Sequence, residues 1–576
     1  MLSADRVDDF PRTFVVKNAA LISMDDELPE QVPGAAVLVR DGIIDGVFAS
    51  SSAMPSDLSD VPSIEAGGRA LLPGLTDGHA HLDRETLGDD LPGFAGARSR
   101  RDVLDVIAEA VAQRHPGDWV VTRPLGTPPR YPDADRPLSG GWLPDRYDLD
   151  SVSRDNPVFI RPIWGFWNMA AKKISFANSL ALAAGGITAS TVSPHEDLTI
   201  VRDERGEPTG MFVETGQQAM VEHTLLRAAP GFSRQQRTAA IGRAFGRYAS
   251  YGTTAFFEGH GIAGEVLDAY ADAYGTPAPL RAHLQLSPFW PEIADLSTTL
   301  EGWRDRLDRH AGPFARVDGI FVEATDDPLR YELVASDHPR TGWAGFSAGA
   351  VVPAARLEAT LLACARAGIR VSGIAANLLD VMARVHRASP IDGLRWTLGH
   401  QATLSAQQID NAAELGLFMT TVTGHHLHRG VYTRALVGTT REKDIVPVRS
   451  LMAAGVPVVL GSDNRPISLW ESVEHVVTRE DDLGNVVAPE QALTRHEALG
   501  LITTNGARLT GDTDTRGVLR RGYQADMALL DRNPLDCDAR ELHATRSVAT
   551  FVAGRPVSAD SSVVRRLGLA PGHRWF

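Results

Sequence analysis

The middle of the chain alternates short, continuously apolar segments with segments in which apolar residues recur every three or four positions. The first pattern is typical of strands buried on both faces, and the second of amphipathic helices. The apolar segments are NPVFIRP, GTTAFFEG, PLRAHLQLSP, DGIFVEAT, GIRVSGIAA, RWTLGH, GLFMTTVTG and VPVVLGSDN. Helical periodicity lies between several of them, as in RQQRTAAIGRAFGRYASY, AARLEATLLACARAG and SAQQIDNAAELG. This alternation predicts a (β/α)8 barrel, although an open doubly wound sheet has the same periodicity.

Two of the expected helices carry a start signal. Ser405 and Gln408 precede one helix at the spacing of a capping box, and Thr494 and Glu497 precede another. In this motif each side chain accepts a hydrogen bond from the other residue's backbone amide. We therefore expect helices to begin directly after Ser405 and Thr494.

The two ends of the chain show a different pattern, in which short strands alternate with turns that contain glycine. Residues 12–70 contain RTFVVKNAALISM and GAAVLVRDGIIDGVFA, and residues 516–557 contain RGVLRRGYQADMALLDRNPL and RSVATFVAGRPV. Such segments predict a small antiparallel sheet. We expect residues 1–70 and 511–576 to form one small β-sandwich domain, and residues 71–510 to form the barrel.

Composition narrows the class of protein. With 576 residues, of which 43 % are hydrophobic, the chain can bury a large core. Its formal charge of −15 argues against nucleic acid or an anionic membrane as a partner. The longest apolar runs are shorter than the roughly 20 residues of a membrane span, and the polar N-terminal segment lacks the apolar core of a signal peptide. The two cysteines make no disulfide framework, and Cys364 is expected in the core. We expect a cytoplasmic homodimer that acts on a small molecule.

The stretch LLPGLTDGHAHLDRE places His79 and His81 at the end of an apolar segment. On a strand both imidazoles project from one face, which suits chelation of a metal ion, although two solvated loop histidines also fit. Several other expected strands end in histidines or carboxylates, and the catalytic residues of barrels lie at these ends. The pattern therefore predicts a metal site. The histidines and carboxylates at the ends of these other strands are Glu258, His260, His283, Glu323, Asp326, Asp327, His400, His425, His426, His428 and Asp463. Two of them, His283 and His425, are interpreted as structural or solvated.

Longer motifs point to a family. They are PGLTDGHAHLD, FANSLALAAGGI followed by VRDERGEPTGMFVE, GTTAFFEG, LRWTLGHQATLSAQQI, VVLGSDN, and LTRHEALGLITTNGARLTG leading into GVLRRGYQADMALLD. In this order they resemble the amidohydrolase superfamily, in the branch that contains N-substituted formamide deformylases and related N-acyl hydrolases. The resemblance covers nearly the whole chain. It implies a metal-dependent hydrolase that cleaves a non-peptide C–N bond.

The resemblance also implies roles for particular residues. His79, His81 and His400 match the family's metal-binding histidines, with zinc as the expected ion. Asp463 matches the aspartate that binds the metal and moves the proton of the attacking water to the leaving nitrogen. His400 and Asp463 are thus the expected catalytic residues.

Two positions depart from the family pattern. The branch usually has a bridging lysine in the segment that reads RVDGIFVEATDD here, and a histidine in the segment that reads GIRVSGIAANLL. Glu323 is the candidate to replace the lysine as a metal ligand, and His260 and His283 are candidates to compensate in space. We expect one bound ion rather than two.

The substrate is the least determined part of the prediction. Trp164 and Trp167 stand where relatives have a polar sequence, and they either line an aromatic pocket or pack in the core. Arg465 is a candidate to hold a substrate carboxylate or to pair with an acid, and His260 is a second candidate for substrate contact. We expect a linear amide or N-acyl compound, hydrophobic or aromatic. The alternatives are deamination of a ring nitrogen, non-hydrolytic metal chemistry, or a non-catalytic barrel that has lost metal ligands and acts as a binding protein.

Overall fold

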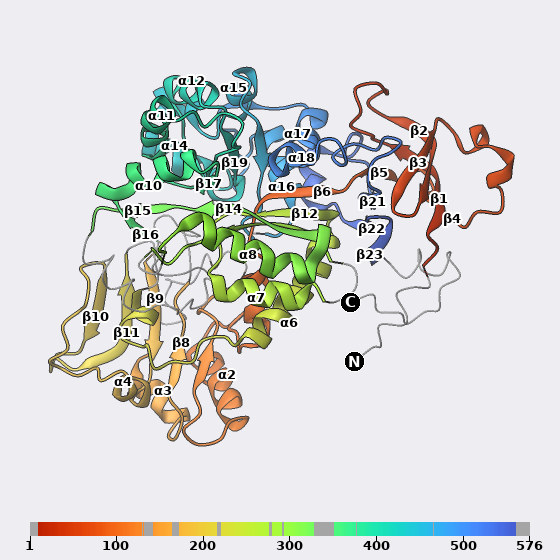
Figure 1. Cartoon of the computed structure of the whole chain (residues 1–576). Helices are drawn as coiled ribbons and strands as arrows, with labels where there is room; N and C mark the ends of the chain where they lie inside the picture. Colours follow the sequence, from red (N-terminus) through yellow and green to blue (C-terminus); the bar gives the residue numbers. More distant parts are fainter. Residues whose placement is uncertain are drawn as a thin grey trace.

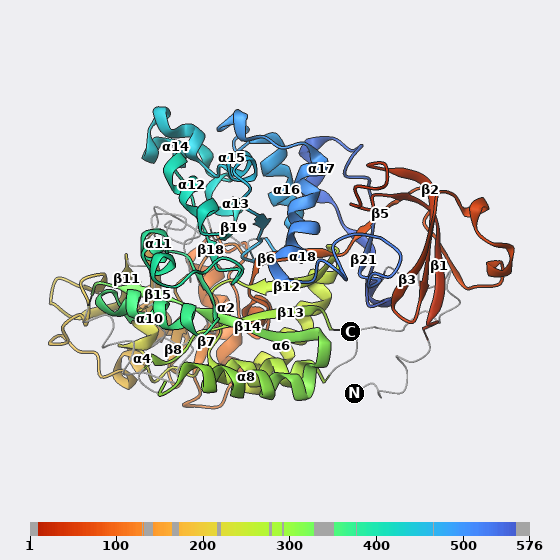
Figure 2. The same cartoon turned by 45° about the horizontal axis from the view of Figure 1, so that its top comes forward.

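A nearly closed barrel of parallel strands occupies the centre of the molecule (Figures 1 and 2). The computed structural model describes residues 10–128, 131, 142–163, 172–215, 220–275, 279–290, 293–327, 351–375, 377–464 and 466–559. In hydrogen-bonded order the eight barrel strands among them are β6 (Leu75–Ala80), β12 (Thr253–Glu258), β13 (Arg281–Leu286), β14 (Ala315–Phe321), β17 (Arg370–Gly373), β18 (Thr397–Gly399), β19 (Phe418–Thr421) and β20 (Val458–Leu460). Every side chain of β12 and β13 is buried, as expected for strands covered on both faces.

Helices follow the strands and cover the barrel from outside (Figure 2). Their inner faces join the barrel side chains in one large apolar core that contains Phe245 and Cys364. The capping boxes at Ser405 and Thr494 are present, which confirms both predicted helix starts. The helices that cover the barrel are α6 (Arg234–Ala249), α7 (Gly264–Ala273), α8 (Leu296–Ala311), α10 (Ala354–Arg366), α11 (Leu378–Ala388), α12 (Ala406–Glu414), α15 (Val448–Ala453), α16 (Leu469–Thr478), α17 (Arg495–Ile502) and α18 (Thr504–Thr510).

Shorter elements lie in the loops at the carboxyl ends of the barrel strands. Helix α1 (Leu82–Glu85) follows β6, while α13 (Thr423–His426) and α14 (Gly430–Val437) follow β19. After β14 the chain forms β15 (Glu323–Thr325), which pairs with β16 (Val351–Pro353) outside the barrel sheet. The barrel predicted from the alternating pattern is confirmed.

Strands from both ends of the chain form one mixed sheet beside the barrel, drawn in red and blue on the right of Figure 1. The two ends meet where β21 pairs antiparallel with β5, with Leu72 opposite Ala528. Alternate residues face different cores: Leu71 and Met527 pack within the sheet's own core, and Leu72 packs against the barrel. The strands are β1 (Thr13–Leu21), β2 (Val32–Arg40), β3 (Ile43–Phe48), β4 (Ser63–Glu65), β5 (Ala70–Pro73), β21 (Met527–Leu530), β22 (Ser547–Val552) and β23 (Arg555–Ala559).

A second sheet is inserted between β6 and β12, at the lower left of Figure 1. The segment NPVFIRP, predicted as a barrel strand, forms β8 of this inserted sheet, so that prediction was wrong. A short buried apolar strand has the same sequence pattern in any sheet, and only its partners distinguish the two cases. The strands in order are β10 (Leu198–Arg202), β11 (Pro208–Glu214), β9 (Lys173–Ala177), β8 (Val158–Ile160) and β7 (Val120–Thr122), accompanied by α2 (Arg100–Ala112), α3 (Arg146–Val152), α4 (Ser179–Ala184) and α5 (Met220–His223).

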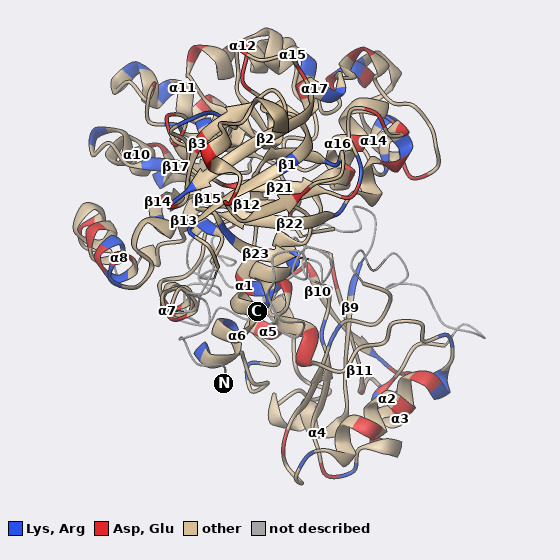
Figure 3. Ribbon diagram, turned by 90° about the vertical axis from the view of Figure 1, so that its right-hand side faces the viewer, with Lys and Arg blue, Asp and Glu red and all other residues tan. Residues whose placement is uncertain are grey.

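The helices around the barrel carry charges of both signs. On α8, arginine positions are interspersed with Asp and Glu (Figure 3). In the part of the chain that the structure describes, we find no helix with the length and apolar character required to cross a bilayer.

Candidate metal centre

Histidines from several barrel strands converge at the carboxyl end of the barrel. His79 lies near the end of β6 and His81 directly follows it. His260 comes two residues after β12 and His400 directly after β18. The ring centroid of His79 lies 5.0 Å from that of His81, 4.9 Å from that of His260 and 4.2 Å from that of His400. The parallel topology therefore brings together residues that are up to 321 positions apart in the chain.

Asp463, in the loop after β20, lies at the centre of this cluster. Its Oδ1 is 2.8 Å from His81 Nε2 and 3.8 Å from His79 Nε2. Its Oδ2 is 2.7 Å from His425 Nε2 and 3.5 Å from His400 Nε2. One carboxylate thus faces four imidazoles, and it is almost completely buried, with 4 % exposure.

Glycines leave the space that the His79 ring occupies. A Cβ added at Gly259 would lie 2.2 Å from His79 Nε2, and one added at Gly461 would lie 2.4 Å from His79 Cβ. A Cβ at Gly399 would lie 3.3 Å from His79 Nδ1. Because real Cβ atoms do not come within 3 Å of other heavy atoms, a side chain at Gly259 or Gly461 would displace the ring.

Outer contacts fix the orientation of His81. Its Nδ1 contacts Glu258 Oε1 in a short hydrogen bond, leaving Nε2 directed at Asp463. The side chain of Asn464 accepts from the His81 amide over 3.1 Å and donates to the His81 carbonyl over 2.8 Å. Tyr248 donates in turn to Asn464 Oδ1. A carboxylate behind a ligating histidine is a common feature of metal sites, because it holds the ring in one tautomer.

The electrostatics of the cluster favour neutral imidazoles at His79 and His400, which face a charged carboxylate. Burial lowers the pKa of His79 well below its usual value and lowers that of His400 to about 4. For His81, burial and Arg84 lower the pKa, but Glu258 and Asp463 outweigh them and raise it to about 9. Burial raises the pKa of Asp463, yet the surrounding histidines hold it well below its usual value. At neutral pH Asp463 is therefore a carboxylate, and His79 and His400 present unprotonated nitrogens.

Three residues of the site have a left-handed backbone. The φ angles are +57° at His400, +47° at Asp463 and +62° at Asn464. Residues other than glycine adopt this conformation at a cost of about 1–3 kcal/mol, and such residues concentrate at functional sites. The barrel therefore holds the loops after β18 and β20 in strained turns that direct these side chains inward.

The donor set fits a divalent ion. His79, His400 and Asp463 each present a donor atom within 4.8 Å of the others, and so do His79, His81 and His260. His79 Nε2 and His400 Nε2 lie 2.9 Å apart. Two buried nitrogens that face each other so closely need a shared proton or a shared cation between them. Imidazoles together with one carboxylate are ligands that zinc prefers.

The structure places the other predicted residues as follows. His425, interpreted from the sequence as structural or solvated, lies in the cluster beside Asp463. His283 lies elsewhere, buried 3.3 Å from Asp318 Oδ2 and 3.4 Å from Asp512 Oδ2. Among the described residues, Glu323 belongs to neither group of donor atoms, because β15 leaves the barrel. The remaining candidates, Trp164, Trp167 and Arg465, lie outside the described residues.

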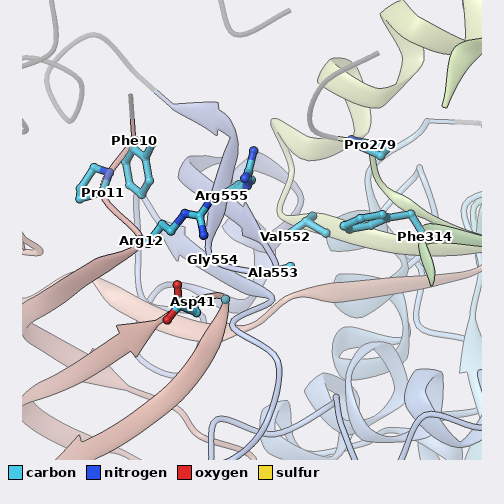
Figure 4. Close-up of a pocket in the computed structure, with 11 residues that line it drawn as sticks. Phe10, Pro11, Arg12, Asp41, Pro279, Phe314, Val552, Ala553, Gly554 and Arg555 are labelled. Carbon is cyan, nitrogen blue, oxygen red and sulfur yellow. The ribbon is translucent and has the colours of Figure 1, made fainter. Parts of the chain in front are cut away.

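A cavity of about 410 Å³ lies away from this cluster (Figure 4). It is bounded by Arg12 and Arg555 of the mixed sheet, and by Pro279 and Phe314, which precede β13 and β14. These two residues mark the amino ends of the strands, opposite the histidine cluster. In barrel enzymes the chemistry takes place at the carboxyl ends, so we place the active site at the cluster.

Known proteins match this chain over most of its length. The model of the amidohydrolase family matches residues 63–558. An N-substituted formamide deformylase of Arthrobacter pascens is 27 % identical over 542 residues, covering 90 % of this chain and 94 % of the relative. The putative amidohydrolase YtcJ of Bacillus subtilis is 23 % identical over 552 residues, covering 91 % and 96 %.

The fold also matches solved structures. An uncharacterized metal-dependent hydrolase from Pyrococcus horikoshii superposes with a TM-score of 0.65 at 18 % identity, covering 92 % of this chain and 99 % of that one. The resemblance drawn from the sequence motifs is confirmed, and the group of donor atoms that His79, His400 and Asp463 bring together disfavours a non-catalytic barrel. The chain belongs to the amidohydrolase family and is a hydrolase that acts on carbon–nitrogen bonds other than peptide bonds.

Proposed function

We propose that the protein hydrolyses the carbon–nitrogen bond of a linear amide or N-acyl compound with the help of one divalent ion, zinc. The observation that carries this proposal is the position of Asp463 within 3.8 Å of four imidazole nitrogens at the carboxyl end of the barrel. His79, His81, His400 and Asp463 would hold the ion. A divalent ion bound in this way lowers the pKa of water towards about 7 and polarises a carbonyl group.

The chain's own residues would then handle the proton. Asp463, which is ionised at neutral pH, accepts the proton of the attacking water and donates it to the leaving nitrogen. His425 Nε2 lies 2.7 Å from Asp463 Oδ2 and orients this carboxylate. The other carboxylate oxygen, Asp463 Oδ1, faces His81. Asp463 and His425 are both buried, which limits exchange of this proton with bulk water.

The proposed substrate class has two supports. A relative that spans nearly the same length is named for N-substituted formamides, which are linear N-acyl compounds. The sequence places Trp164 and Trp167 in a segment where an apolar or aromatic amide is expected to bind. Arg465 follows Asn464 directly and stays the candidate for holding a substrate carboxylate.

The test is a hydrolysis screen on zinc-loaded protein. N-formyl, N-acetyl and N-benzoyl derivatives of aryl and alkyl amines are assayed for release of the free amine, beside heterocyclic amines assayed for ammonia. We expect amine release from the linear compounds, abolished in His79→Ala. Ammonia from the ring compounds alone would indicate a deaminase instead, and turnover of neither class by zinc-replete protein would refute the proposal.

The quaternary structure and the compartment rest on the sequence alone. A homodimer and a cytoplasmic location stay predictions, since a single chain is described. Sedimentation equilibrium checks the first, and fractionation of the source cells checks the second.

A further inference from the structure

We propose that His428, Glu471 and His475 form a second divalent-cation site, separate from the catalytic cluster. Glu471 and His475 lie four residues apart on α16 and therefore share one helix face. His428 approaches them from the loop between α13 and α14. Donor atoms of the three residues lie within 4.8 Å of one another. Two imidazoles and a carboxylate form a ligand set that binds zinc and similar transition metals.

The spacing of these donors suits a shared ion better than direct ion pairs. Glu471 Oε1 lies 3.8 Å from His428 Nδ1 and 3.8 Å from His475 Nε2. Both distances exceed a hydrogen bond, for which 2.7–3.2 Å is usual. Ligands about 2.0–2.1 Å from a tetrahedral ion lie about 3.4 Å apart, so each imidazole needs to approach Glu471 by only a few tenths of an ångström. A third pair, in which Glu474 of α16 meets a histidine from the segment Ala539–Ala544, differs: His543 Nδ1 lies 2.7 Å from Glu474 Oε2, as in a direct hydrogen bond.

One imidazole, that of His475, also has an outer hydrogen-bond partner on its other nitrogen, and the other imidazole has an acidic side chain nearby. His475 Nδ1 lies 3.0 Å from Thr423 Oγ1, and when this nitrogen carries the proton, Nε2 presents its lone pair towards Glu471. His428 Nε2 lies 3.8 Å from Asp482 Oδ2, and the amide of Asp482 donates to the His428 carbonyl over 3.0 Å. Outer partners of this kind select the tautomer that binds a metal.

The site would fix a segment that also serves the catalytic centre. Thr423 begins α13, which carries His425, the partner of Asp463. The amide of His428 donates to the Thr423 carbonyl over 3.2 Å, so both residues belong to one compact turn. An ion bound there would join α16 to this turn. The site is partly open to solvent, with side-chain exposures of 21 % for His428 and 17 % for Glu471. An ion can therefore enter it from outside.

The test uses zinc titration of the full-length chain in a background that weakens the catalytic site. Metal-free His79→Ala is titrated with Zn²⁺ by calorimetry, beside His79→Ala/His428→Gln and His79→Ala/Glu471→Gln. We expect each added substitution to remove one equivalent of bound zinc. His79→Ala/His543→Gln is the matched control, because it breaks the direct hydrogen bond between His543 and Glu474 of α16, and it should keep that equivalent.

Two further variants probe the outer partner. Thr423→Val should weaken zinc binding at this site by about 10–100-fold, and Thr423→Ser, which keeps the hydroxyl, should restore it. Circular dichroism verifies that each variant is folded. Equal zinc stoichiometry in His79→Ala and His79→Ala/His428→Gln would overturn the proposal. Loss of the equivalent in the His543→Gln control would do the same, since the binding would then not depend on the three proposed ligands.

Discussion

The backbone amide of Asp463 donates a hydrogen bond of 2.7 Å to the carbonyl of His79. This bond joins the end of β20 to β6, which are the two edge strands of the barrel sheet. Nearby, the amide of Ser462 donates to Asp77 Oδ1 over 3.0 Å. The contacts that close the barrel are therefore the same contacts that set the distance between His79 and Asp463. Disturbing this junction should disturb the metal site before it disturbs the rest of the fold.

Gly259→Ala tests the space around His79. The added methyl group would lie 2.2 Å from the His79 ring, so the ring must move out of the cluster. We expect loss of most catalytic-site zinc and a fall in kcat/KM of about 100-fold or more, because a ligand displaced by about 1 Å can cost that much. Gly242→Ala on α6, where a Cβ meets nothing within 4 Å, is the control and should behave as wild type. Full activity of Gly259→Ala would show that catalysis does not require the His79 ring at its present place in the cluster.

The sequence was informative about the site wherever a motif is local. His79 and His81 share one strand end, and the GSDN motif brings Asp463 with it, so these residues could be named before the structure was known. The barrel followed from the period of its strands and helices. Nothing local connects His425 to Asp463, because their contact depends on how far α13 turns after β19. The contact of His425 with Asp463 was therefore not predicted.

Sheet membership was the part that the sequence could not determine. Val158–Ile160 is as apolar and as buried as a barrel strand, but its neighbours are β7 and β9 of the inserted sheet. The role of Gly259 was likewise hidden, since a glycine before a histidine is unremarkable until the ring of His79 lies against it. Both features depend on contacts between distant segments, which a single sequence does not record.

Asp463→Asn separates proton transfer from metal binding. The amide keeps the size of the carboxylate and leaves three histidine ligands in place, so much of the zinc should remain. It cannot accept the proton, so turnover should fall by about two to four orders of magnitude. Zinc content and kcat are measured on the same preparation, with Asp463→Ala as the variant that also loses a ligand. Turnover within a few-fold of wild type would assign the proton transfer to another group, with Glu258 and Glu323 as the next candidates.

His425→Ala tests whether this histidine acts through Asp463. Removing it leaves Asp463 Oδ2 without its 2.7 Å partner, and we expect kcat to fall by about 10–100-fold while KM changes little. If His425 only orients the carboxylate, the double variant His425→Ala/Asp463→Asn should have almost the same kcat as Asp463→Asn alone. His283→Ala is a comparison at a buried histidine outside the site and should affect stability rather than kcat. Additive losses in the double variant would show an independent role for His425.

The ion pair between Arg281 and Asp526 should stabilise the contact between the barrel and the mixed sheet. Both side chains are buried, and Arg281 Nε lies 2.7 Å from Asp526 Oδ2. Asp526→Asn leaves the buried guanidinium without the carboxylate to which it donates two hydrogen bonds, which costs about 3–5 kcal/mol of unfolding free energy. Thermal and urea denaturation measure the loss. Glu358→Gln breaks the exposed pair with Arg384 and should cost less than about 1 kcal/mol.

The same pair predicts a pH dependence of stability. Burial raises the pKa of Asp526, but the charge and hydrogen bonds of Arg281 outweigh it and hold the folded-state pKa below its usual value. The folded state therefore binds fewer protons than the unfolded state. The stabilisation that ionised Asp526 contributes is fully present above the pKa of the unfolded state, about 4. It is lost as the pH falls through the folded value. The difference in stability between wild type and Asp526→Asn should shrink below about pH 4, and a constant difference down to pH 2 would contradict this.

The number of ions in the catalytic site is the last prediction, and we expect one. The two donor groups, His79 with His81 and His260, and His79 with His400 and Asp463, share His79. The Nε2 atom of a neutral imidazole binds one ion, so the groups compete for a single ion instead of holding one each. Two ions about 3.5–4 Å apart would also need a bridging anion. Among the described residues, Glu323 belongs to neither group.

Metal analysis of His428→Gln isolates this site, because that variant lacks the second proposed one. After loading with excess zinc and exhaustive dialysis, we expect about one equivalent, and close to none in His79→Ala/His428→Gln. Arg384→Gln, which breaks the exposed pair with Glu358, controls for effects of substitution. Two equivalents in His428→Gln, reduced to one by Glu323→Ala, would show that Glu323 bridges a pair of ions and that the loop after β14 adopts a different position when metal is bound.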